Sequence, residues 1–143
     1  MPKIRHIALT TKDPSRVAAF YKEAFGMQEV RRNPRGAVFL TDGYINLALL
    51  NTKSEQDADV GAQGEGFCGL HHIGFEVENL DRAAENIERA NGRQLTQKDH
   101  LDLDMAAHDT RNFEMKWAGP DEVVIDISHT GWEIGVPSPA KGG

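Results

Sequence analysis

The sequence predicts an α+β fold built from two tandem copies of a β-α-β-β-β module. Two observations carry this prediction: the chain repeats itself, and both copies show the same order of extended and helical patterns. A shift that moves residue 4 onto residue 70 places Ile4–Leu9 on Leu70–Phe75 without a gap, and it also places Gly26 on Gly92. Internal self-similarity of this kind indicates a duplicated supersecondary unit.

Each copy opens with a strand and continues into an amphipathic helix. Apolar residues recur at the i, i+3, i+4, i+7 spacing of a helix with one buried stripe. They are Val17, Phe20, Tyr21 and Ala24 in the first copy and Ala83, Ala84, Ile87 and Ala90 in the second. Asp13 and Asn79 suit the N-caps of these helices. Gly26 and Gly92 are expected to form left-handed C-terminal caps.

Three further strands are expected after each helix. They lie at Met27–Arg32, Ala37–Thr41 and Tyr44–Leu50 in the first copy and at Arg93–Gln97, Asn112–Trp117 and Val123–Ser128 in the second. Aligning the last strands places Asn46 on Asp126, so the segment Lys98–Arg111 absorbs the extra residues of the second copy. A long loop of this kind often carries function.

The chain of 143 residues is expected to form a single domain. Module one spans residues 3–51, a polar linker spans 52–67, module two spans 68–129, and a tail follows at 130–143. A module of four strands and one helix cannot cover both faces of its sheet. The modules should therefore pack on each other within one chain or across a homodimer, and a homodimer is expected.

Composition and charge narrow the class of protein. Hydrophobic residues make up 39% and charged residues 27%, which are ordinary globular values. The net charge of −6 argues against nucleic acid or an anionic membrane as the main partner. Cys68 is the single cysteine, so no internal disulfide forms, and no apolar run resembles a signal peptide or a membrane span. A cytoplasmic location is expected.

Two histidines and one carboxylate form a candidate metal site. His6 and His72 hold the same place in the first strand of each module, so a pseudo-twofold relation would bring both imidazoles to its axis. Asp126 alternates with apolar neighbours in the last strand, where a carboxylate is costly unless its charge is compensated. A lone strand histidine is more often a core residue, but symmetry favours ligation. We expect one divalent ion, Fe(II), Mn(II), Zn(II) or Ni(II).

The segments IRHIALTTKDPSRVAAFYKEAFGM, GLHHIGFEVENLDRAAENIERANGR and GPDEVVIDIS resemble the vicinal oxygen chelate superfamily. This superfamily includes glyoxalase I, bleomycin resistance protein, methylmalonyl-CoA epimerase and type I extradiol dioxygenases. The resemblance covers residues 3–129 and implies the metal ligands His6, His72 and Asp126. The family's fourth position falls on Asn46, a further ligand or substrate contact, and the family usually has Glu where Asp126 stands.

The segment from His108 to Asp126 is similar in spacing to the extradiol dioxygenase signature, which implies that His108 is a catalytic acid/base. Lys116 stands where that signature has Tyr. Asn46 can offer an oxygen to a metal but cannot act as a general base. Elsewhere, His71 is expected to point away from His72, because successive strand residues face opposite sides.

The sequence therefore predicts a metal-dependent enzyme acting on a small molecule that chelates the metal through adjacent oxygens. Dioxygenase-like or lyase-like chemistry is favoured, on the grounds of Asn46 and His108. One alternative is a proton-transfer isomerase of the glyoxalase I or epimerase type. Another is a metal-free protein that binds a small molecule such as a drug, with His6 and His72 in structural roles.

Overall fold

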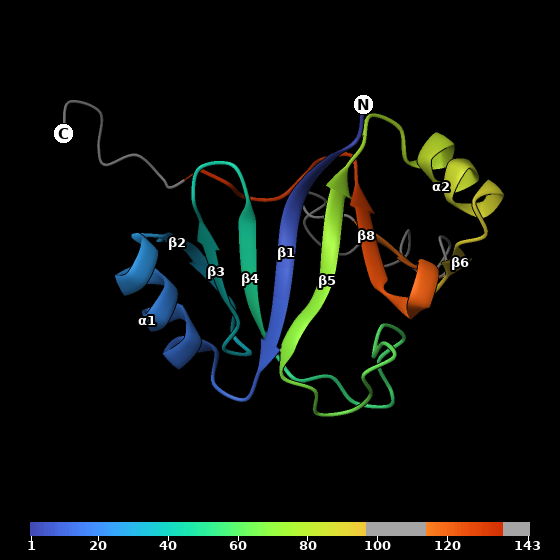
Figure 1. Ribbon diagram of the computed structural model, residues 1–143. Coiled ribbons are helices and arrows are strands. Elements are labelled where there is room, and N and C mark those ends of the chain that lie inside the picture. The colour runs from blue at the N-terminus through green and yellow to red at the C-terminus, as the bar shows by residue number, and fades with distance from the viewer. Residues whose placement is uncertain (97–113, 136–143) are drawn as a thin grey trace.

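A computed structural model describes residues 1–96 and 114–135 and confirms the α+β fold (Figure 1). Module one contains β1 (Lys3–Thr11), α1 (Pro14–Phe25), β2 (Gln28–Arg32), β3 (Val38–Thr41) and β4 (Asn46–Asn51). Module two contains β5 (Gly69–Glu76), α2 (Leu80–Arg89), β6 (Arg93–Gln94), β7 (Met115–Ala118), a short 3-10 turn (Pro120–Glu122) and β8 (Val124–Ser128). The strands form one sheet in the order β2-β3-β4-β1-β5-β8-β7-β6.

The two modules join within one chain, through antiparallel pairing of β1 with β5 at the centre of the sheet (Figure 1). Ile7 lies opposite Ile73, and these two residues are also equivalent in the sequence repeat. The ladder shifts register at Arg5 in β1 and at His71 in β5, which are equivalent as well. The pairing is therefore symmetric about the Ile7–Ile73 pair, down to its two bulges.

Each helix covers the outer part of its own module (Figure 1). Ala18 of α1 packs with Leu47 and Leu49 of β4, and Trp117 of β7 anchors the corresponding core beneath α2. Strand side chains alternate between the two faces of a sheet. The strand residues that lie between these core positions therefore face the opposite, concave side of the sheet. In the described parts of the chain, no helix is long and apolar enough to cross a membrane.

The helix ends match the sequence prediction except at Gly92. The side chains of Asp13 and Asn79 accept backbone hydrogen bonds at the predicted N-caps, and Gly26 has the expected left-handed conformation with a φ of 69°. In module two the left-handed residue is Asn91, with a φ of 73°. Gly92 is required for another reason, since a side chain there would collide with Ile87.

The strand register corrects the predicted alignment of the last strands. Asn46 lies directly opposite the histidine of β1. The histidine of β5 instead faces Val124, and Asp126 lies two residues further along β8. The module-one counterpart of Asp126 is therefore Ala48 and not Asn46. The sequence alignment had matched the polar residue of each strand, whereas pairing with β1 and β5 sets the register.

After β8 the chain crosses the sheet to module one, and we call residues 129–135 the crossing segment (Figure 1). Two side chains of module one donate hydrogen bonds to its backbone. The Asn46 amide donates to the Glu133 carbonyl, and the Thr41 hydroxyl donates to the Ile134 carbonyl, each at 2.7 Å. The crossing segment therefore fastens the end of module two onto module one.

Trp132 carries the crossing segment into the concave face. Its indole stacks on the imidazole of His6, with ring centroids 4.7 Å apart and an interplanar angle of 5°. Gly74 provides the space for this arrangement. A Cβ atom on Gly74 would lie 2.7 Å from the Trp132 ring and 2.8 Å from the Cβ of His6.

We expect Gly74→Ala to lower the free energy of unfolding by about 1–3 kcal/mol, because overpacking must displace one of these rings. Urea unfolding measures the change. Gly135→Ala is the matched control, since a Cβ there meets no atom within 4 Å. Adding Trp132→Leu should recover part of the loss. A loss of the same size with and without the indole would contradict the packing described here.

Candidate metal centre

The three predicted ligands come together on the concave face. The Nε2 atoms of His6 and His72 are 3.2 Å apart, and His72 Nε2 lies 3.1 Å from Oδ2 of Asp126. These side chains are almost completely buried. Two ligand atoms that bind one ion at about 2.1 Å and at right angles are about 3.0 Å apart. Both distances therefore match adjacent ligand positions of an octahedral metal site, and all three ligand atoms lie within 4.8 Å of one another.

The hydrogen bonds of His6 fix the position of its proton. The Asn46 amide nitrogen donates to the Glu133 carbonyl, so the amide oxygen of Asn46 faces His6 Nδ1, at 2.8 Å. An amide oxygen only accepts hydrogen bonds. Nδ1 of His6 must therefore carry the proton, which leaves the Nε2 lone pair directed into the site.

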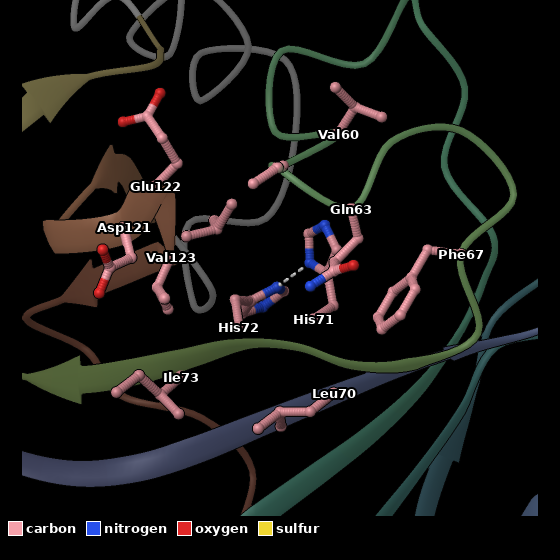
Figure 2. Close-up of a pocket in the computed structure, with 13 residues that line it drawn as sticks. Val60, Gln63, Phe67, Leu70, His71, His72, Ile73, Asp121, Glu122 and Val123 are labelled. Carbon is pink, nitrogen blue, oxygen red and sulfur yellow. Dashed lines mark hydrogen bonds between the residues drawn. The ribbon is translucent and has the colours of Figure 1, made fainter.

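A relay through His71 fixes the proton of His72 in the same way. His71 Nε2 lies 2.7 Å from the Asp59 carbonyl, which only accepts, so this nitrogen carries the proton of a neutral His71. His71 Nδ1 is then an acceptor, and it lies 2.6 Å from His72 Nδ1 (Figure 2). His72 consequently donates through Nδ1, and its Nε2 lone pair also faces the site.

This relay shows that the expectation for His71 was wrong. Figure 2 shows the rings of His71 and His72 on the same side of β5. The register shift at His71 is a β-bulge, and an extra residue in a strand interrupts the alternation of side chains. Adjacent histidines can then contact each other instead of facing opposite sides.

Two lone pairs thus face each other with no proton between them. Burial lowers the pKa of His6 and lowers the pKa of His72 well below its ordinary value, so both rings are neutral near pH 7. Neutral imidazoles are the form that binds metal ions. An ion placed between the two nitrogens would convert a repulsive contact into coordination, so the donor set fits a divalent metal.

The buried carboxylate of Asp126 is compensated by Lys116, its neighbour across the β7–β8 ladder. Lys116 Nζ lies 3.1 Å from Oδ1 and 3.0 Å from Oδ2. Burial by itself would raise the pKa of Asp126, but the Lys116 charge, the hydrogen bonds from Glu114 and Lys116 and the influence of His6 together outweigh burial, so the pKa is lowered. The sequence required a compensating charge, but only the strand register identifies Lys116 as its source.

Glu114 is a second carboxyl group in the site, and the sequence did not single it out. Its Oε1 accepts a hydrogen bond from the Trp132 indole at 3.2 Å, and its side chain is hydrogen-bonded to Asp126. Burial, followed by the charge of Asp126, raises the pKa of Glu114 to about 7. Its position two residues before Lys116 placed it on the same strand face, but nothing in the sequence fixed that strand beside the site.

These groups line one pocket of about 150 Å³ on the concave face, with Phe39, Ala48 and Leu50 on its apolar side. A neighbouring pocket of about 140 Å³ lies on the linker side of His72, lined in part by Phe67 and Leu70 (Figure 2). His72 borders both pockets. The pocket on the concave face is the one that contains the convergent polar groups.

The other two predicted site residues differ in outcome. Asn46 lines the pocket, but its amide oxygen is hydrogen-bonded to His6 Nδ1, so in this structure it orients the His6 ring. His108 lies outside the residues that the structure describes.

Comparison with known proteins agrees with the fold. Human mitochondrial methylmalonyl-CoA epimerase is 29% identical over 104 residues, which are 67% of this chain and 58% of that protein. The chain thus matches less than two thirds of the length of this relative. A solved methylmalonyl-CoA epimerase in complex with methylmalonyl-CoA and ammonium has a TM-score of 0.62 at 20% identity, covering 89% of this chain and 93% of that one.

A Streptomyces coelicolor methylmalonyl-CoA epimerase variant, in complex with 2-nitronate-propionyl-CoA, has a TM-score of 0.58 at 19% identity, covering 87% of this chain and 94% of that one. At such identities the structural likeness concerns the fold. The sequence profile of one family matches residues 3–127, which is most of the chain. The chain therefore belongs to the Glyoxalase/Bleomycin resistance protein/Dioxygenase superfamily.

Proposed function

We propose that this protein is a divalent-metal-dependent isomerase that moves a proton on the carbon beside a carbonyl group. The substrate would be a small molecule that binds the metal through two adjacent oxygens. The observation that carries the proposal is the convergence of two imidazole lone pairs and a carboxylate in the pocket that also holds Glu114. A Lewis acid and a proton acceptor would then act on one substrate.

His6, His72 and Asp126 would hold the ion, which on the donor set alone is Fe(II), Mn(II), Zn(II) or Ni(II). When bound, the metal would supply positive charge that stabilises negative charge developing on the substrate oxygen. Asn46 and His71 would fix the ring orientations of the two histidines. Hydrogen bonds of this kind typically strengthen metal binding by about 10- to 100-fold.

Glu114 is the best-placed proton acceptor in the described part of the pocket. Its carboxylate would take the proton from the carbon, and the electron pair of the broken C–H bond would move onto the carbonyl oxygen as an enolate. Return of a proton to the carbon would complete the isomerisation. A pKa of about 7 suits such a base, because an acceptor works best when its pKa is near the working pH.

Lys116, which also contacts Asp126, would assist this step. Its ammonium group lies 3.6 Å from Glu114 Oε2 and borders the same pocket. A fixed positive charge beside a reacting carbonyl stabilises the enolate oxygen as it forms. The site would therefore combine a proton acceptor with two sources of positive charge.

This proposal prefers the isomerase alternative to the dioxygenase-like or lyase-like chemistry that the sequence favoured. That preference relied on Asn46 being unable to act as a base and on His108. Glu114 supplies a candidate base that the sequence argument did not consider. The epimerase names of the relatives point in the same direction. A homodimer and a role for His108 as acid/base remain predictions.

His72→Ala should remove stoichiometric metal while leaving the fold intact, because strand packing holds β5 in place. Metal analysis and far-UV circular dichroism of the purified protein measure the two effects. His71→Ala should weaken metal binding by about 10- to 100-fold, through loss of the relay. His129→Ala, at an exposed position, is the control. Unchanged metal content in His72→Ala would refute the metal centre, whereas an unmodified protein that binds no divalent metal would support the metal-free binding protein.

Glu114→Gln should lower the isomerisation rate by about 10²- to 10⁴-fold with little change in metal content, because the amide cannot accept the proton. Exchange of the substrate α-hydrogen in D₂O, followed by NMR, measures the step directly. Methylmalonyl-CoA and the methylglyoxal–glutathione adduct are the first substrates to test. Oxygen consumption with a panel of catechols, in the absence of any exchange, would instead support a dioxygenase.

A further inference from the structure

Lys116 holds both oxygens of the carboxylate that would bind the metal. Its ammonium nitrogen lies 3.0 Å and 3.1 Å from the two oxygens of Asp126. Asp126 is fully buried, and the lysine side chain retains 25% of its exposure. The only carboxylate in the cluster of His6, His72 and Asp126 is therefore already engaged by a cation, as far as the described residues show.

The lysine is held in this place by more than one acid. Its nitrogen also lies 3.5 Å from Asp59 Oδ2 and 3.6 Å from Glu114 Oε2. Asp59 belongs to the linker and Glu114 immediately precedes β7, so carboxylates from separate segments contact the ammonium group. A metal ion would have to share Asp126 with this group, since its neighbours keep the lysine at the site.

Sharing Asp126 with Lys116 should weaken the binding of some metal ions more than that of others. Among the described residues, the hydrogen bonds of the Lys116 ammonium group go to Asp126 and not to the imidazoles, so the two Nε2 lone pairs remain directed at the ion. Imidazole suits Zn(II), Ni(II) and Cu(II), whereas Mg(II) and Mn(II) rely on carboxylate oxygens. A carboxylate that also binds an ammonium group is a weaker ligand, and this loss affects the oxygen-dependent ions most.

We propose that Lys116 sets the metal selectivity of the site, and that its ion pair with Asp126 favours Zn(II) or Ni(II) over Mn(II) and Mg(II). The proposal rests on the metal centre described under the proposed function. The proposed role of Lys116 is to determine which ion binds. It does not depend on whether the metal-bound protein turns over a given substrate.

The test compares the dissociation constants of Mn(II) and Zn(II) for the full chain, by calorimetry for Mn(II) and by chelator competition for Zn(II). In Lys116→Met both ions should bind more tightly, because a like charge is removed. Mn(II) should gain more, so the ratio of the Mn(II) to the Zn(II) constant should fall about tenfold. Lys116→Arg, which keeps the charge on Asp126, should retain the ratio of the unmodified protein.

Lys53→Met is the matched control, because Lys53 pairs with Asp59 at 3.2 Å and, in the part of the chain that the structure describes, forms no ion pair with Asp126. It removes one nearby positive charge without freeing the candidate ligand, so the ratio should stay unchanged. Lys116→Gln serves if the Met variant does not fold, since an amide can still donate a hydrogen bond to the carboxylate. Thermal unfolding without metal checks each variant.

The outcomes separate this inference from the proposed function. An equal Mn(II) to Zn(II) ratio in the unmodified protein and in Lys116→Met or Lys116→Gln, with both metals bound, would overturn the role of Lys116 and leave the metal centre standing. An equal fall in Lys53→Met would also overturn it, since charge alone would then explain the change. Failure of every variant and of the unmodified protein to bind either ion would overturn the metal centre itself.

Discussion

The antiparallel pairing of β1 with β5 is the constraint on which the rest of the structure depends. It joins two modules that could not bury their sheets alone, and it places equivalent residues on opposite sides of the Ile7–Ile73 pair. Because His6 and His72 are each one residue from that pair, symmetry of the backbone brings their rings together. The register of β1 and β5 therefore determines where the candidate site lies, and its chemistry depends on that position.

The symmetry of the backbone does not extend to the side chains around the two histidines. In module one, Asn46 orients the ring from the neighbouring strand. In module two, the same task falls to His71, which reaches its neighbour only because the strand is bulged there. The strand carboxylate is also present in module two alone, since Ala48 occupies the position in module one that corresponds to Asp126. A duplicated frame therefore supports an asymmetric site.

The sequence predicted the parts of the structure that depend on periodic patterns. The repeat located both helices, most strands and the pair His6 and His72, and strand alternation identified Asp126 as the third candidate ligand, because apolar spacing and β-branched content encode local structure directly. It could not locate the bulge at His71, since a bulge is an unpaired residue defined by the partner strand, and the sequence of β5 alone does not show which residue is left unpaired. Nor could it pair Lys116 with Asp126 or bring Glu114 into the site, because cross-strand partners depend on register, which one strand's sequence does not contain.

The crossing segment has a consequence for the order in which the molecule can be assembled. Residues 129–135 follow all the strands in the chain, yet Trp132 packs against His6 of the first strand, and Glu133 holds Asn46. Contacts between residues so far apart in sequence form late and slow folding. During synthesis, module one can pair its own strands early. The pocket is complete only after residues 129–135 have left the ribosome, so that Trp132 can pack against His6.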